Sequence, residues 1–428
     1  MKIRRSIVAG YLILLAALFS LFLSGAALNN LGLNYSADAY SAGLKLHPYT
    51  LLTSAAFLVL VCGRKALGRC LQIRQFRTAV LGAGILALIV LVKTVVGDSQ
   101  SMGFTVDTII AAFIVAAALP LISPLFAARL STIAFLFLIV ECLLAMGEGV
   151  LKVNLIPMDV WYGSYFRSTA LQGHPLNNAL IVVTVAVALQ AYARRLTSTL
   201  IFCLTVGALL AFGARGALAV YLLVNAITFT RFGLRSVQQV LILIVGGALG
   251  AIGLAWFVFS GVVGDRIAQV GAYDDSTQTR FQALDILTHL NWTQIMLGNG
   301  SDAIAHLMAQ SDVSVVENFM VGYVLTFGGF LTLVIFYCVY RTFKTFLIDV
   351  PAAGRRRLLT VLFVFVCTAL TNNSLMTKTP ALYLLMMGLW WVRCRSITHE
   401  FSQASIQVPG KAYSKIQGRK SFEMIANQ

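Results

Sequence analysis

The chain has 428 residues, of which 59% are apolar and 11% charged, and its mean hydropathy is +0.84. Soluble domains carry about 25% charged residues, so this composition excludes a water-soluble globular fold. The net charge of +16 would suggest nucleic acid as the partner of a soluble protein. In a membrane protein, the position of the basic residues along the chain decides what that charge means.

Hydrophobic stretches recur along the whole chain and predict an all-α polytopic membrane protein. A membrane helix needs about 20 apolar residues, and the chain has room for about 12 such helices. The predicted spans are residues 7–27, 49–62, 78–96, 104–123, 131–150, 179–193, 198–213, 217–230, 237–260, 318–340, 358–371 and 381–392.

The basic residues predict which side of the membrane each connecting segment faces. With the N-terminus in the cytoplasm, most of the 32 Lys and Arg residues fall in cytoplasmic segments. This bias follows the positive-inside rule and predicts that both termini are cytoplasmic. We expect one transmembrane domain over 1–392, with an outer loop at 261–317, and a basic cytoplasmic tail at 393–428. The basic residues left on the outer side or within spans are Lys45, Lys93, Lys152, Arg167, Arg215, Arg266, Arg280 and Lys378.

The seven cysteines lie in predicted spans or on the inner side, so we expect no disulfide. Two acids, Glu141 and Glu148, share one face of the span at 131–150. Intramembrane acids can act as proton relays, and this pair supports an alternative interpretation of the chain as a transporter. Glu148 lies near the outer end of its span, where it would also suit an ion pair with an arginine.

A polar segment precedes the span at 179–193. It contains Tyr165-Phe166-Arg167-Ser168, followed by Gly173-His174-Pro175-Leu176-Asn177-Asn178. Arg167 offers a planar guanidinium suited to phosphate, and Pro175 indicates a fixed turn at the start of the span. His174 is either an acid or base in catalysis, a ligand contact, or a capping residue.

Arg215 lies in the turn between two short predicted spans. The second of these spans reaches only about 21 Å of a hydrocarbon core about 30 Å thick, so the turn is predicted to lie below the outer surface. A sunken arginine needs an anionic partner. We therefore predict a site for an anionic ligand at Arg215. The alternative is a structural ion pair with Glu148 or Asp107.

The outer loop at 261–317 is predicted to contain short amphipathic helices. Ser276 or Thr277 would cap the first helix, and a short helix from Asp302 would follow a turn at 298–301. Arg280 lies beside an apolar stripe that we expect to lie on the membrane surface. That stripe comprises Phe281, Leu284, Leu287 and Leu290.

Glu317 and Asn318 lie at the outer mouth of the span at 318–340. A carboxylate beside an apolar wall can work as a general base. The alternative is that Glu317 only favours the positive end of the helix dipole. The sequence has no metal-ligand spacing, phosphate-binding loop or dinucleotide motif, so we expect no cofactor.

Four groups of motifs follow one another along the chain: Phe-Arg-Ser with Gly-His-Pro-Leu-Asn, Gly-Ala-Arg-Gly-Ala, Ser-Thr-Gln-Thr-Arg-Phe with Leu-Gly-Asn-Gly, and Glu-Asn-Phe-Met-Val-Gly-Tyr with Phe-Gly-Gly-Phe. Their order and sidedness resemble the O-antigen ligase / Wzy-type polysaccharide polymerase family of bacterial inner-membrane proteins. The resemblance covers residues 150–335 by motif and the whole chain by topology. It implies a GT-C-like helical fold, in which Arg167, Arg215 and Arg280 hold an undecaprenyl-pyrophosphate-linked glycan at the outer face.

One departure from the family pattern favours a polymerase over a ligase. Ligases place a histidine before the asparagine at this span, and this chain has Glu317 there. The resemblance thus implies a repeat-unit polymerase, with an O-antigen ligase as the alternative. Glu317 and His174 would be catalytic, and Asn177 and Asn318 would support them. The implied partners are a lipid-linked oligosaccharide, membrane lipid, a chain-length regulator and export proteins, with no nucleic acid.

Overall fold

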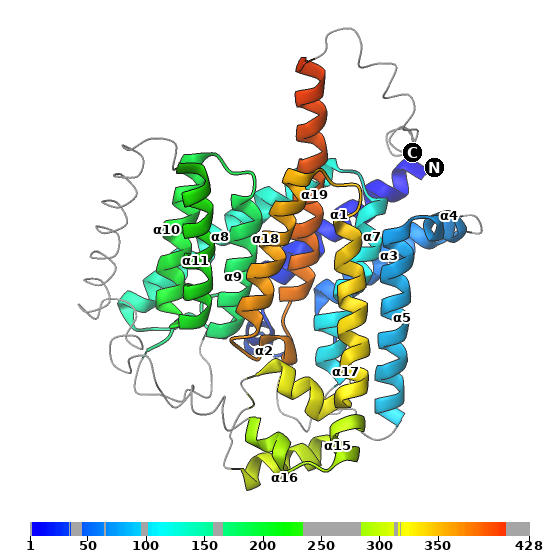
Figure 1. Ribbon diagram of the computed structural model, residues 1–428, viewed down its shortest axis with the longest axis vertical. Coiled ribbons are helices and arrows are strands. Elements are labelled where there is room, and N and C mark those ends of the chain that lie inside the picture. Colours follow the sequence, from blue (N-terminus) through cyan, green and yellow to red (C-terminus); the bar gives the residue numbers. More distant parts are fainter. Residues whose placement is uncertain are drawn as a thin grey trace.

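The computed structural model describes residues 2–33, 35, 45–63, 66–95, 102–156, 166–233, 284–311, 316 and 318–407. These residues form helices and connecting turns, and no strand occurs among them. Figure 1 shows the longer helices side by side in one bundle. In chain order the elements are α1 (Lys2–Phe22), α2 (Gly25–Asn30), α3 (Pro48–Val61), α4 (Ala66–Gln72), α5 (Arg74–Val95), α6 (Met102–Phe104), the π-helix η1 (Thr105–Ile110), α7 (Ala111–Ala118), η2 (Leu119–Leu121), α8 (Leu125–Leu151), α9 (Pro175–Gln190), α10 (Arg195–Ala211), α11 (Arg215–Gly233), α15 (Trp292–Leu297), α16 (Ser301–Gln310), α17 (Phe319–Phe346), α18 (Ala352–Ala369), η3 (Ser374–Met376) and α19 (Ala381–Gln407).

The helices lie where the hydrophobic stretches predicted them. Apart from 237–260, which lies outside the described residues, each predicted span coincides with a helical segment. Four of them, α1, α5, α8 and α17, are long and apolar enough to cross a membrane, and α3 with α4 adds a fifth if that bent pair counts as one span. By length and composition these are the helices of a membrane protein. Twelve spans remain a prediction.

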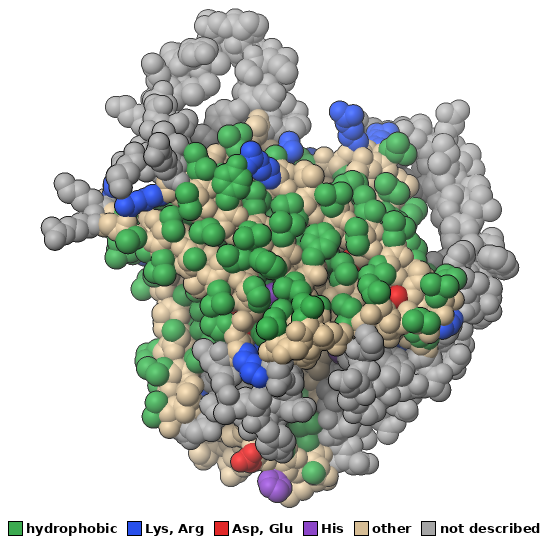
Figure 2. Space-filling model, turned by 180° about the vertical axis from the view of Figure 1, so that it is seen from behind, with side chains coloured by type: hydrophobic (Ala, Val, Ile, Leu, Met, Phe, Trp, Pro, Cys, Tyr) green, Lys and Arg blue, Asp and Glu red, His purple; other side chains and the backbone are tan. Residues whose placement is uncertain are grey.

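The two ends of the bundle differ in charge. The start of α1 and the end of α19 lie at the same end (Figure 1). In the space-filling view of Figure 2, Lys and Arg side chains gather mainly at that end, above a broad apolar surface. This arrangement fits the predicted topology, in which both termini share the basic, cytoplasmic side. Which side of the membrane this end faces remains a prediction.

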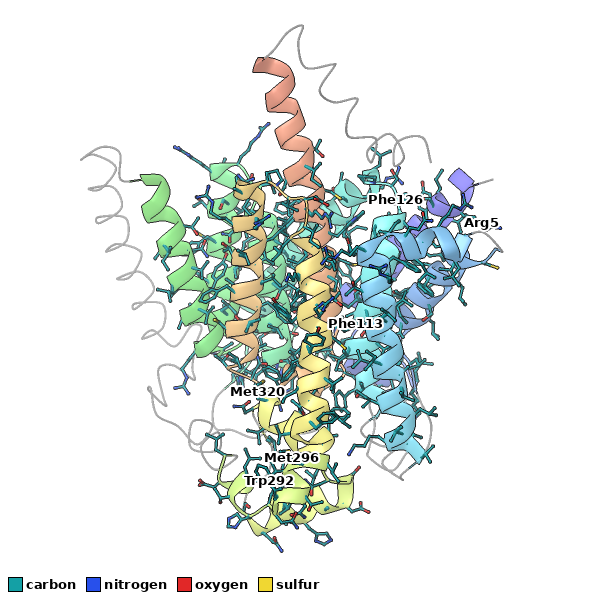
Figure 3. All side chains as sticks on the ribbon, turned by 45° about the vertical axis from the view of Figure 1, so that its right-hand side comes forward. Arg5, Phe113, Phe126, Trp292, Met296 and Met320 are labelled. Carbon is teal, nitrogen blue, oxygen red and sulfur yellow. The ribbon has the colours of Figure 1, made fainter. Side chains whose placement is uncertain are left out.

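Small residues bring the helices of the bundle close together. A Cβ atom on Gly10 of α1 would lie 2.5 Å from the nearest ring atom of Phe126 in α8. A Cβ atom on Gly82 of α5 would likewise meet the ring of Phe113 in α7. Figure 3 shows both phenylalanines within the bundle. Such glycines allow the dispersion contacts that hold helices together where no hydrophobic effect acts between them.

Helix α17 is broken at Gly328, whose φ of 76° and ψ of 163° are not helical. The part before the break crosses the lower end of the bundle, and the part after it runs along the bundle (Figure 1). Gly298, at the end of α15, fits against the break, because a Cβ atom there would lie 2.6 Å from the Gly328 nitrogen. The amide of Asn299 then donates to the Leu325 carbonyl at 2.8 Å. The Leu-Gly-Asn-Gly and Phe-Gly-Gly-Phe motifs therefore meet in space.

The predicted membrane-facing stripe of the outer loop packs elsewhere. Leu290 is buried and Leu287 packs beside it, together with Ile286, against Val321 and Leu325 of α17. These two leucines cover the part of α17 before its break, so the expectation that they lie on the membrane is wrong. Leu284, the other described member of the stripe, is exposed. Phe281 and Arg280 lie outside the described residues.

The predicted boundary of the tail at residue 392 falls inside a continuous helix, because α19 extends to Gln407. Arg393 belongs to the bundle, since its guanidinium donates to the side chain of Gln75 at 3.1 Å and to the carbonyl of Thr345 at 3.0 Å. Residues 408–428 lie outside the described part. All seven cysteines are free, as expected.

Candidate functional site

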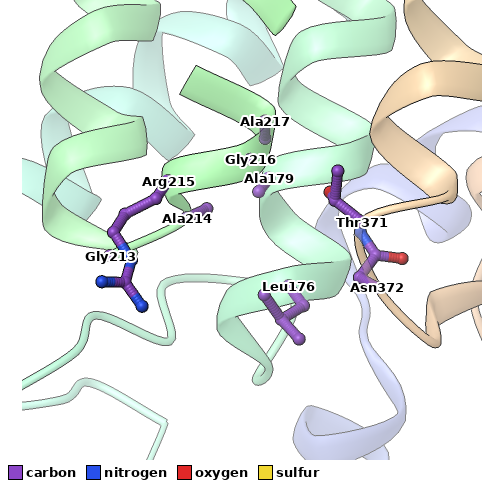
Figure 4. A pocket seen from close by; sticks show the side chains of 9 residues that line it. All are labelled: Leu176, Ala179, Gly213, Ala214, Arg215, Gly216, Ala217, Thr371 and Asn372. Carbon is purple, nitrogen blue, oxygen red and sulfur yellow. The ribbon is translucent and has the colours of Figure 1, made fainter. Parts of the chain in front are cut away.

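A pocket lies where α9 and α11 begin, at the end of the bundle opposite the start of α1 (Figures 1 and 4). The first turns of both helices and the segment that follows α18 form its walls. Because a helix start carries free N–H groups and partial positive charge, this end of the two helices favours an anion. The lining residues are Leu176, Ala179, Gly213, Ala214, Arg215, Gly216, Ala217, Thr371 and Asn372.

The turn before α11 places Arg215 in the pocket wall. Gly213 has a φ of 61°, and its N–H donates to the Leu210 carbonyl at 2.9 Å, which ends α10 in the left-handed conformation that favours glycine. Arg215 is the first residue of α11, and its partly exposed side chain points away from the helix (Figure 4). Gly216 lets the loop after α18 approach, because a Cβ atom there would lie 2.7 Å from Cβ of Thr371.

Arg167 is joined directly to the same turn. Its Nε donates to the carbonyl of Phe212 at 2.8 Å, and the amide of Ser168 donates to the carbonyl of Ala211 at 3.0 Å. The structure thus brings together the Phe-Arg-Ser segment and the turn that carries Arg215. Two arginines that the sequence separates by a whole helical hairpin therefore lie at one end of the bundle.

Glu148 holds the segment that carries Arg167. Its Oε2 accepts from the Ser168 hydroxyl at 2.6 Å and from the amides of Thr169 at 3.0 Å and Ala170 at 2.9 Å. Its Oε1 accepts from the amide of Leu155 at 2.6 Å. A carboxylate that accepts this many hydrogen bonds is well compensated for its burial. Sequence reasoning assigned Glu148 to a proton relay or an ion pair and missed this role, because three of the four partners are backbone amides.

Asp107, the other acid proposed as a partner of Arg215, accepts hydrogen bonds from other groups. Asp107 lies in the π-helix η1, where its carboxylate accepts from the hydroxyls of Tyr35 and Thr50 and from the amide of His47. The neighbouring Thr108 hydroxyl donates to the Thr377 carbonyl at 2.7 Å. The π-helix therefore fixes the loop that follows α18. Short π-helical segments inside α-helices are frequent at functional sites.

His174 precedes Pro175 at the start of α9 and lies near Arg167. Burial and the positive charge of Arg167 lower the pKa of His174 to about 4, so its imidazole is neutral at cellular pH. Its Nδ1 is buried with no hydrogen-bond partner among the described residues. A neutral imidazole in this place can accept a proton or a hydrogen bond.

The two predicted supporting asparagines also lie at this end. Asn177 accepts a long hydrogen bond, 3.4 Å, from the hydroxyl of Thr377. The side chain of Asn318 caps α17 by accepting from the amide of Met320 at 2.9 Å. The amide of Phe319, the residue after Asn318, donates to the carbonyl of Asn372 at 3.4 Å. Both asparagines therefore connect to the loop after α18. Glu317, the predicted base, and Arg280 lie outside the described residues.

The loop at 371–380 is the part of the site that sequence reasoning did not select. Thr371 and Asn372 line the pocket. The amine of Lys378 donates to the carbonyls of Tyr35 at 3.1 Å and Lys45 at 3.0 Å and lies over the ring of Tyr35. The sequence signal that could have identified this loop is Lys378, which lies in a polar stretch between two apolar spans. In the parts of the chain that the structure describes, no group of three or more His, Cys, Asp or Glu residues is placed to bind a metal.

No protein-family model and no curated protein matches the chain.

Proposed function

We propose that the chain is a repeat-unit polymerase for an exported polysaccharide. It transfers a glycan from undecaprenyl pyrophosphate onto the end sugar of a second lipid-linked repeat unit. The observation that carries this proposal is the pocket at the starts of α9 and α11, with Arg215 in its wall and Arg167 bonded to the adjoining turn. Arginine forks and helix starts are the groups that proteins use for phosphates.

The proposed reaction depends mainly on stabilising the negative charge of the leaving group. The bond between the anomeric carbon and the pyrophosphate oxygen breaks, and a hydroxyl oxygen of the acceptor sugar forms the new bond. Negative charge collects on the departing pyrophosphate, which is already a good leaving group. Fixed guanidinium groups in a poorly hydrated pocket stabilise that charge without reorganising, and this is usually the largest contribution to such catalysis.

The acceptor hydroxyl must also lose a proton. Glu317 directly precedes Asn318, which caps α17 beside Asn372 of the pocket wall, so we assign the general base to Glu317. His174, neutral and close to Arg167, is the second candidate to take the proton or to orient the hydroxyl. The carboxylate of Glu148 is held by the Arg167 segment, which favours a structural role over the proton relay that transport would need.

The reaction would take place at the outer face of a bacterial inner membrane. The supporting feature is that the pocket and the more basic end of the bundle lie at opposite ends. The substrates would be lipid-linked oligosaccharides, with a chain-length regulator and export proteins as partners.

The test is the lipid-linked saccharide pool of a strain that lacks this chain. We expect single lipid-linked repeat units to accumulate and long chains to disappear, with recovery when the gene is restored. Long unligated chains in the pool would instead show a ligase. An unchanged pool with unchanged polymer would contradict the proposal.

A further inference from the structure

The short helix α15 presents an exposed apolar surface, which we call the α15 surface, formed by Trp292, Met296 and Leu297. The side chain of Trp292 is 71% exposed and that of Leu297 is 63% exposed. Figure 3 shows Trp292 and Met296 at the lower end of the molecule, near Met320 of α17 and far from Arg5 at the other end. A large exposed indole needs a partner that accepts both its apolar ring and its N–H.

The α15 surface continues the apolar exterior of the membrane helices. Helix α15 packs against the broken helix α17, whose exposed side chains just beyond the break include Phe330 and Leu333. On another side, Lys93 at the end of α5 donates to the carbonyl of Leu297 at 3.4 Å, and the exposed Val92 and Val95 flank this lysine. The helices next to α15 thus expose the kind of surface that faces lipid.

Backbone groups at both ends of α15 have hydrogen-bond partners within the protein, which suits a poorly hydrated environment. Asn291 and Gln294 form a reciprocal capping box, with hydrogen bonds of 2.8 and 3.0 Å, that satisfies donors at the start of the helix. At the other end, the amide of Gly298 donates to the carbonyl of Gln294 at 2.9 Å, and Lys93 satisfies Leu297. Backbone groups near lipid have to be satisfied within the protein, because no water replaces them there.

The neighbouring helix α16 has the opposite character on its outer side. Ile304, Leu307 and Met308 pack inward on the cluster around α17. Its exposed side chains include Asp302 and His306. The two short helices therefore differ in what they present to their surroundings.

We propose that the α15 surface lies in the interfacial layer of the lipid bilayer, with Trp292 at the level of the headgroups and the outward side of α16 in water. The partner is the lipid surface. Tryptophan is enriched at this level because its ring favours the acyl boundary and its N–H favours the polar layer. The proposal rests on the placement of α15 and not on the enzymatic activity.

Tryptophan fluorescence in reconstituted vesicles tests this placement. The full chain and its Trp292→Phe variant are reconstituted in phosphatidylcholine vesicles whose acyl chains carry bromine atoms near the headgroup or near the methyl end. The difference between the two chains gives the emission of Trp292 alone, because both chains keep the other four tryptophans, Trp161, Trp256, Trp390 and Trp391. We expect that difference to be quenched, and more strongly by the bromines near the headgroup.

A matched control uses the neighbouring helix. His306→Trp, introduced in the Trp292→Phe chain, places an indole on the outward side of α16, and we expect its emission to escape quenching. An unquenched Trp292 signal would overturn the proposal, whether water or a protein partner covers the α15 surface. Equal quenching at both positions would also overturn it, because α15 would then not lie at a boundary.

Discussion

Arg167 reaches its place in the site through Glu148. We expect Glu148→Gln to lower the stability of the chain, because the amide nitrogen of glutamine would face a hydrogen-bond donor, either the Leu155 amide or the group formed by Ser168, Thr169 and Ala170. A buried donor without an acceptor costs about 1–3 kcal/mol. Thermal unfolding of the purified chain in detergent measures the loss.

Glu141→Gln is the matched control, since this carboxylate lies on the same helix and accepts one hydrogen bond, from the amide of Leu171 at 3.2 Å. We expect a smaller loss of stability in that variant. Equal midpoints of unfolding for wild type and Glu148→Gln would show that the four hydrogen bonds do not hold the segment.

His174 makes stability depend on pH. Its pKa is about 4 in the folded chain and 6.5 in an unperturbed imidazole, so the unfolded chain binds more protons between these values. Stability therefore rises with pH across this window and is lost as the pH falls from 6.5 towards 4. The unfolding midpoint of His174→Asn should fall less than that of the wild type between pH 7 and pH 5, in buffers of constant ionic strength. Identical slopes for the two chains would contradict this account of the histidine.

At the scale of elements, the junction of α15 with α17 depends on glycine. Gly298 has a φ of 79°, and a Cβ atom there would lie 2.6 Å from the Gly328 nitrogen and from the Thr326 carbonyl. We expect Gly298→Ala to detach α15 from the break, since both the backbone conformation and the space exclude a side chain. Cleavage of the 284–311 segment by added protease in membrane vesicles should then become faster.

Gly300→Ala is the control for this junction. Gly300 has a φ of −75°, and a Cβ atom there meets nothing within 4 Å. Its rate of cleavage should equal that of the wild type. Cleavage of Gly298→Ala at the wild-type rate would mean that α15 stays bound to α17 without the close contact between Gly298 and Gly328.

The helices were predictable from sequence and the junctions between them were not. Continuous apolar runs locate α5 and α8 because a membrane helix satisfies its own backbone within one segment. The break at Gly328, the π-helix around Asp107 and the leucines that cover α17 depend on contacts between distant segments. The glycines and leucines can be found in the sequence, but the residues that they contact cannot.

The site shows the same division. Arg215 was predicted because the turn between two short predicted spans was expected to lie below the outer surface. The structure places Arg215 in a pocket wall, although α11 has 19 residues and is longer than the predicted span. Arg167 was selected for its chemistry, and the structure bonds it to Phe212 beside that turn. Glu148 and Asn372 were missed as parts of the site, since an acid bound to backbone amides and a loop between the last two helices leave no spacing pattern.

At the scale of the whole molecule, the described Lys and Arg side chains on the face seen in Figure 2 gather mainly at the end of the bundle where α1 starts, and the pocket lies at the opposite end (Figure 1). Cysteine labelling tests which end faces outward. In a chain without its native cysteines, we expect Asp302→Cys on α16 to react with a membrane-impermeant maleimide in spheroplasts. Ala352→Cys, at the start of α18, should react only after permeabilisation. The reverse pattern would place the pocket in the cytoplasm and end the case for a polymerase of exported glycans.

We propose that Arg215 holds the pyrophosphate of the donor, and the lipid-linked saccharides of cells carrying Arg215→Lys report on this role. A lysine keeps the charge and loses the fork, so we expect a rate loss of about 30- to 1000-fold, equivalent to about 2–4 kcal/mol. At normal membrane levels of the chain, polymer should disappear and single lipid-linked units should accumulate. Arg195→Lys, at the start of α10, should leave polymer unchanged. Full-length polymer from Arg215→Lys and from Arg215→Ala at normal levels would show that Arg215 does not hold the pyrophosphate.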